Sequence, residues 1–214
     1  MELGENLNRA ASFTGKLFSD VGNLILLIAV NLIPVVNIIF LGYTAKIIRE
    51  DPEEPPKLSD YGKLFVDGLL VLAAVLVYAI IPAIIIIIGA LASMPFYLHA
   101  PFVPLFPLQL SALSVIGLVL LFISMIIGVM AVGNMVRTGD FSKIFAFSEN
   151  WQLIGRVGLA NYLVWLFVMF VVFLIAAAVG SLIPWVGGAI FGVFSSIFFG
   201  KSLALILNEV KAPS

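Results

Sequence analysis

The apolar residues of this chain run in long blocks and do not alternate with polar ones. Three blocks contain no Asp, Glu, Lys or Arg: Val21–Ala45, Gly68–Val136 and Val157–Gly200. A soluble helix keeps a polar stripe with a period near 3.6 residues, and a strand of a membrane barrel alternates every second residue. The blocks show neither pattern, and each is longer than the ~18 residues that mark a membrane span. They predict an all-α fold, a single polytopic bundle of membrane helices over residues 1–214.

Turn residues divide these blocks into about six membrane segments, arranged as three hairpin-like units. The units are 16–48, broken at Pro34; 63–94 with its return through 109–136; and 157–182 followed by 185–207. Val21–Ile33 would cover only ~20 Å as a helix, which is short of the ~30 Å hydrocarbon core. One kinked span over 17–48, giving five segments, is therefore the alternative.

A short motif supports the division into units. GKLFSD at Gly15–Asp20 recurs as GKLFVD at Gly62–Asp67, and each copy precedes an apolar run that ends in LIP or IIP. A weaker third copy begins with GRVGLAN at Gly155 and ends with LIP at Pro184. The spacing predicts an ancestral duplication. In the first two copies Lys and Asp stand four residues apart, so we expect each pair to meet on one helix face.

The segments between the blocks have distinct compositions. Residues 1–16 place apolar side chains at helical spacing, which predicts an amphipathic helix on the membrane face, with a mobile tail as the alternative. Residues 50–62 and 137–156 carry charge and predict two loops on one side. Residues 93–109 hold four prolines and four aromatics without charge, so they predict an irregular outer loop. This loop is either an aromatic anchor or a lid with Tyr97 and His99 as its polar groups.

The charges predict the orientation in the membrane. With six segments, all eleven Lys and Arg residues fall on one side, and the opposite side carries only His99. Positive residues favour the cytoplasmic side of a membrane. The sequence therefore predicts a multi-pass protein of the cell membrane with both termini in the cytoplasm.

Composition narrows the function classes. The chain is 62% hydrophobic and 11% charged, with a net charge of −1, no Cys and one His. Near-neutral charge argues against a nucleic-acid binder, and the missing Cys excludes thiolate chemistry. An intramembrane protease needs Ser with His, or paired Asp, at depth, and neither occurs. We therefore expect no catalytic, cofactor or metal-binding residues, and a protein that is not an enzyme.

Two residue sets are candidates for packing and binding. Gly188, Gly192, Ser196 and Gly200 recur every four residues, a small-residue pattern that lets another helix approach closely, within the monomer or across a dimer. The polar residues expected at depth include Asn31, Asn37, Asn134 and Asn161. These four asparagines are the candidate lining of a polar cavity near the midplane.

Several stretches resemble the domain of unknown function 4013 family of polytopic membrane proteins, which are largely archaeal. The similarity runs from about Leu41 and rests on LGYTAKIIRED, on PPKLSDYGKLFVDG, on the Asp-Phe at Asp140–Phe141, and on the Phe-Gly-Lys at Phe199–Lys201. The resemblance implies a helical membrane protein and supplies neither an activity nor catalytic residues.

Two functions fit these patterns. The leading interpretation is a structural or accessory membrane component that acts through helix packing and its cytoplasmic loops, with membrane lipids and a membrane-protein partner or a second copy as its contacts. The alternative is transport or handling of lipids or apolar solutes through a midplane cavity.

The topology can be tested by accessibility of introduced cysteines, because the native chain has none. Pro55→Cys and Ser148→Cys should react with an impermeant reagent only from the cytoplasm, and Ala100→Cys only from outside. Ala11→Cys should label from the cytoplasm if 17–48 is a hairpin. Labelling of position 11 from outside would reduce the count to five segments.

Overall fold

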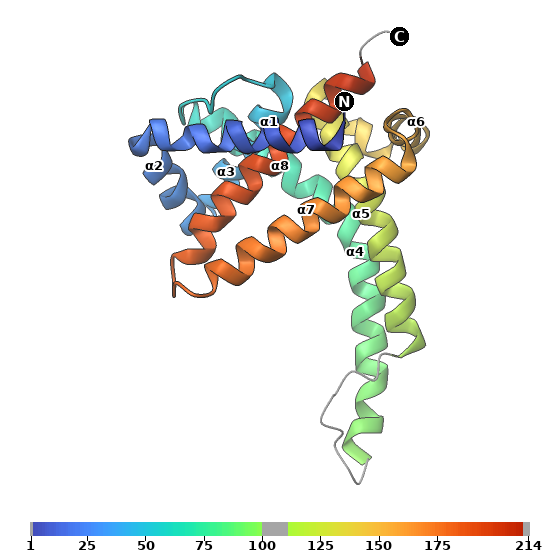
Figure 1. Cartoon of the computed structure of the whole chain (residues 1–214). Helices are drawn as coiled ribbons and strands as arrows, with labels where there is room; N and C mark the ends of the chain where they lie inside the picture. The colour runs from blue at the N-terminus through green and yellow to red at the C-terminus, as the bar shows by residue number, and fades with distance from the viewer. Residues whose placement is uncertain (1, 100–110, 212–214) are drawn as a thin grey trace.

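The computed structural model describes residues 2–99 and 111–211, and every element in these ranges is a helix (Figure 1). The elements are α1 (Leu3–Gly15), η1 (Lys16–Ser19), α2 (Val21–Leu32), α3 (Asn37–Glu50), α4 (Tyr61–His99), α5 (Ala112–Thr138), η2 (Phe141–Phe145), α6 (Phe147–Val157), α7 (Leu159–Gly180) and α8 (Gly187–Lys211). The all-α prediction is confirmed for the described residues. Among the described residues, four helices are long and apolar enough to cross a membrane: α5, α7, α8, and α4 over Tyr61–Ala92.

The α4–α5 hairpin extends well beyond the other helices (Figure 1). Its outward side chains are apolar on nearly every turn; Ile81, Ile87 and Phe122, for example, are more than half exposed. Soluble monomers rarely expose so large an apolar surface, whereas a bilayer would cover it. The helix α4 runs through Pro82 and Pro95 to His99. The expectation that prolines keep all of 93–109 irregular is therefore wrong for 93–99. Residues 100–110 lie outside the described part, and so do the side chains of Tyr97 and His99.

The N-terminal unit returns to the end from which it starts. At the beginning of α2, the Asn23 amide donates to the Pro56 carbonyl at 3.1 Å and accepts from the Leu58 N–H at 2.9 Å. Since residues 56 and 58 follow α3, the α2–α3 pair is a hairpin. With 12 and 14 residues, these helices reach only ~18 and ~21 Å, less than the hydrocarbon core. The structure thus supplies four helices of spanning length, and the count of six stays a prediction.

The GKLFSD motif does not form the expected ion pair. The chain bends by 104° between residues 3–19 and α2, so Lys16 and Asp20 do not share a helix face. Lys16 instead lies 3.7 Å from the Glu54 carboxylate, and Asp20 caps α2 by accepting from the Asn23 N–H at 3.0 Å. In the second copy Asp67 pairs with Arg49 of α3. The repeated Asp residues therefore make different contacts in the two copies.

A second repeated element does adopt one local structure twice. LIPVV joins α2 to α3, and LIPWV joins α7 to α8. In both turns the residue after proline has a left-handed backbone, with φ of 70° at Val35 and 71° at Trp185. Both close with an N–H donating to the carbonyl of the Ile before proline, at 2.9 Å from Asn37 and 3.0 Å from Gly187. The shared sequence therefore encodes a shared turn.

The amphipathic helix α1 packs on protein. Its apolar face, with Ala10 and Phe13 fully buried, lies against α8, as Figure 1 shows where α1 crosses α8. The buried Asn6 amide donates to the Ser202 carbonyl at 3.0 Å. The opposite face carries exposed Glu5 and Arg9. The expected amphipathic helix is present, but its apolar face is occupied by α8.

The helices α3 and α4 touch backbone to backbone. A Cβ atom at Gly42 would lie 1.8 Å from the Leu64 carbonyl oxygen, and one at Gly68 would lie 1.8 Å from the Ile38 carbonyl oxygen. Any side chain at either position would therefore push the helices apart. Two reciprocal glycines fix this crossing.

Replacing Gly42 or Gly68 with Ala should lower the free energy of unfolding by about 1–3 kcal/mol, the usual cost of overpacking a closely packed contact. Thermal unfolding in detergent measures the loss. Gly62→Ala, on the same helix α4 with nothing within 4 Å of the added carbon, is the matched control and should not lower stability. Equal melting temperatures for Gly42→Ala and Gly62→Ala would contradict the contact.

Candidate functional site

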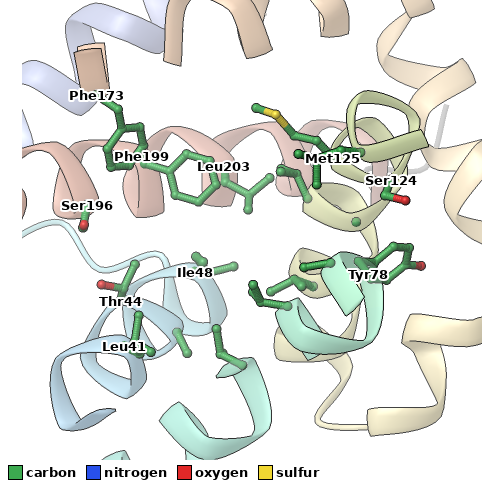
Figure 2. Close-up of a pocket in the computed structure, with 18 residues that line it drawn as sticks. Leu41, Thr44, Ile48, Tyr78, Ser124, Met125, Phe173, Ser196, Phe199 and Leu203 are labelled. Carbon is green, nitrogen blue, oxygen red and sulfur yellow. The ribbon is translucent and has the colours of Figure 1, made fainter. Parts of the chain in front are cut away.

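A cavity of about 390 Å³ lies among α3, α4, α5, α7 and α8 (Figure 2). Fourteen of its 18 lining residues have no polar group in the side chain, and the other four carry only hydroxyls: Thr44, Tyr78, Ser124 and Ser196. The Thr44 hydroxyl donates to the Phe40 carbonyl at 3.2 Å, and the Tyr78 hydroxyl donates to the Ile144 carbonyl at 2.5 Å. Two of the four hydroxyls therefore already have partners in the protein, and what the cavity presents is almost wholly apolar.

The walls of the cavity come from chain segments far apart in sequence. Leu41 and Ile48 of α3 face Phe199 and Leu203 of α8 across it, and Met125 of α5 lies beside Leu203 (Figure 2). The cavity is partly open to its surroundings. An apolar space of this size is within the range of ligand-binding pockets, and its only polar groups are the four hydroxyls.

The candidate asparagines lie in three separate places, and none of them lines this cavity. Asn31 and Asn37 are hydrogen-bonded to each other, and the Asn31 amide donates to the Ala189 carbonyl at 2.9 Å, tying α2 to α8. Asn134 is fully buried and donates to Glu149 and Asn150, each at 3.0 Å. Asn161 is exposed near the start of α7. At the first two places the amides join helices.

The four small residues of α8 have different surroundings. A Cβ at Gly200 would lie 3.0 Å from Cγ2 of Thr44 in α3, and one at Gly192 would lie 3.1 Å from Nδ2 of Asn31 in α2. Ser196 lines the cavity, and nothing lies within 4 Å of a Cβ at Gly188. Within this chain, two of the four positions therefore pack against another helix: Gly200 against α3 and Gly192 against α2.

A second, smaller cavity of about 110 Å³ lies next to the first. It contains the ion pair between Arg49 and Asp67, whose side chains are 27% and 16% exposed. Ala45 lines both cavities. The Nε atom of Arg49 is buried and has no hydrogen-bond partner among the described residues. The sequence placed Arg49 and Asp67 at segment ends but contained no signal that they meet.

A buried lysine marks the same end of the molecule. Lys201 is 6% exposed and donates to the Pro52 carbonyl at 2.6 Å and to the carboxylate of Asp51. Asn208 donates to the other oxygen of that carboxylate, and Nζ of Lys201 lies 5.0 Å from the ring centre of Phe13. A buried charge is stable only when it is paired. These contacts fasten α1 and the loop after α3 to α8.

The fold and cavity define an α-helical bundle with four helices of membrane-spanning length around an apolar site. The model of the family described as protein of unknown function (DUF4013) matches residues 25–185, most of the chain. The protein belongs to this family, as the resemblance implied. The match begins within α2, earlier than Leu41, and ends before α8, so it leaves out Phe199–Lys201. No curated protein and no solved structure matches the chain.

The packing role of the small residues on α8 can be tested by comparing substitutions at Gly200 and Gly188. Gly200→Leu should lower the free energy of unfolding by about 1–3 kcal/mol because the side chain would collide with Thr44. Gly188→Leu should have little effect on the monomer because the position is open. Chemical unfolding with light scattering reports both stability and oligomeric state. If the wild type is a dimer and Gly188→Leu is a monomer, Gly188 lies at a dimer contact. Equal stability of Gly188→Leu and Gly200→Leu would contradict the contact between α3 and α8.

Proposed function

We propose that the protein binds the acyl chain of a lipid in the cavity between α3, α4, α5, α7 and α8. The observation that carries the proposal is the cavity itself, at about 390 Å³ with 14 of 18 lining residues free of polar side-chain groups. Such a lining offers dispersion contacts and no charge, which suits a hydrocarbon chain. This is the lipid-handling function that the sequence left as its alternative.

The position of the cavity supports a membrane lipid as its occupant. Its α4 and α5 walls belong to the charge-free block Gly68–Val136, whose outward residues are apolar over the described stretches 68–92 and 111–136. In the six-segment topology this block would cross the bilayer twice, and the partly open cavity would then face acyl chains. A short re-entrant α2–α3 hairpin, which enters and leaves on one side, would serve as one wall without spanning the membrane.

The structural or accessory function is the second candidate, and it has its own observation. The segments that carry the charged residues gather at one end, formed by α1, the loop after α3, α6 and the end of α8 (Figure 1). The loop is held by Lys201 and Lys16, and Lys143 pairs with Glu149 at 2.7 Å. This surface, which the positive-inside rule places in the cytoplasm, could receive a partner protein.

Filling the cavity tests the two candidates together. Ala79 lines the cavity, so Ala79→Phe should displace a bound chain, whereas Ala90→Phe, at an exposed position on the same helix α4, should not. Native mass spectrometry of protein purified in mild detergent should show a retained lipid in the wild type and in Ala90→Phe, and none in Ala79→Phe. Retention of the same lipid by all three would exclude the cavity. A co-purifying protein with no retained lipid in any variant would favour the accessory function.

A further inference from the structure

Three aromatic side chains of η2 and α6 form an exposed patch at the charged end of the molecule. Phe145, Phe147 and Trp151 are 53%, 56% and 52% exposed. Phe147 and Trp151 stand four residues apart on α6, so they are neighbours on its surface. Single apolar residues are common on any protein surface, whereas a group of large aromatic side chains marks a contact with lipid or with another protein. This aromatic patch therefore needs an occupant.

The helix α6 has three sides of different character. The side that packs on the protein carries its buried residues: Asn150, Leu153 and Ile154. Another side carries exposed polar residues: Ser148, Gln152 and Arg156. At 100° per residue, Phe147 and Trp151 form a strip between these two sides. A helix at a membrane surface has this arrangement, with an apolar strip toward the acyl chains and a polar strip toward water.

The aromatic patch adjoins the apolar outer surface of α4. The ring of Phe147 lies edge-on to the ring of Tyr78 in α4, with ring centres 6.4 Å apart. The Tyr78 hydroxyl donates to the Ile144 carbonyl of η2, which ties the two segments together. Ile81, about one turn from Tyr78 along α4, is 63% exposed. The patch is thus continuous with the surface that a bilayer would cover, and this continuity favours lipid as its occupant.

The position of α6 along the long helices fits the edge of a bilayer. The Asn134 amide of α5 donates to Asn150 of α6 at 3.0 Å, and Asn134 lies 22 residues after Ala112, the first residue of α5. That length of helix covers ~33 Å, close to the ~30 Å of the hydrocarbon core. The 22 residues of α7, which follows α6 directly, cover the same length. Figure 1 shows α6 almost end-on where α5 ends and α7 begins, so α6 crosses α5.

We propose that η2 and α6 form an interfacial anchor, in which Phe145, Phe147 and Trp151 insert between the phospholipid headgroups of the leaflet at the charged end. The indole of Trp151 suits this zone because it combines an apolar body with one polar N–H group. The polar side of α6 faces the water. The anchor sets the depth of α5 and α7 in the bilayer, and it does not depend on a ligand in the cavity.

Quenching of Trp151 by brominated phosphatidylcholines tests the anchor. Bromine quenches tryptophan at short range, so a lipid brominated at carbons 6 and 7 of one chain reports the headgroup region, and one brominated at carbons 11 and 12 reports the core. In vesicles of either lipid, Trp185→Phe retains Trp151 and Trp165, and Trp151→Phe/Trp185→Phe retains Trp165 alone. The difference between them is the signal of Trp151, whether or not a lipid in the cavity quenches Trp165. The 6,7-dibromo lipid should quench this signal more strongly than the 11,12-dibromo lipid.

Two tryptophans introduced into Trp151→Phe/Trp185→Phe serve as matched controls. Phe122 is 62% exposed on α5, about midway between Ala112 and Asn134, so Phe122→Trp should be quenched more strongly by the 11,12-dibromo lipid. Gln152→Trp places the reporter on the polar side of α6, next to position 151 in sequence, and should be quenched less than Trp151 by both lipids.

Three results would overturn the anchor. If neither lipid quenches Trp151, the aromatic patch lies in water and is open to a partner protein. Stronger quenching of Trp151 by the 11,12-dibromo lipid would place α6 inside the hydrocarbon core. Equal quenching at positions 151 and 152 would show that the aromatic and polar sides of α6 do not face different surroundings. All three results leave the proposed lipid site in the cavity untouched, because that site is tested by Ala79→Phe.

Discussion

The close contact between the backbones of α3 and α4 is the constraint on which the rest of the structure depends. Apolar helices in lipid gain little by hiding apolar surface from one another, so close packing has to hold them together. Gly42 and Gly68 permit that packing because neither has a side chain. The crossing places Arg49 against Asp67 and presents Thr44 to Gly200 of α8. The position of one wall of each cavity therefore depends on these two glycines, which carry only a hydrogen atom where other residues have a side chain.

The long helices could be predicted from the sequence because a charge-free apolar run of such length is typical of a membrane helix and of few other structures. The expected segments 63–94, 109–136, 157–182 and 185–207 fall within five residues of the ends of α4, α5, α7 and α8. The short N-terminal unit was harder to predict because its helices are below spanning length. The amphipathic pattern of residues 1–16 indicates that α1 needs an apolar partner. The pattern is the same whether that partner is α8 or a lipid surface. Long-range partners leave no periodic signal in the sequence.

The cavity could not be predicted for a related reason. Val71 and Val132, which line it, are the same type of residue as Val77 and Val115, which face outward. Searching for polar residues at depth selected the asparagines, which mainly satisfy backbone carbonyls and other amides between helices. Gly128 lines the cavity as well, and a Cβ atom there would lie 3.1 Å from Cγ of Tyr78, so its missing side chain makes room for that ring.

The position of α1 on α8 has a consequence for the order in which the protein assembles. The Asn6 side chain bonds to Ser202, a residue 196 positions later and in α8, the last helix among the described residues. During synthesis α1 emerges before α8, so its apolar face lacks this partner until α8 has been made. Contacts between such distant segments form late, after the loop between them has closed. The docking of α1, together with the seating of Lys201 against Phe13, therefore has to wait for α8, and a nascent chain that lacks α8 carries an uncovered amphipathic helix.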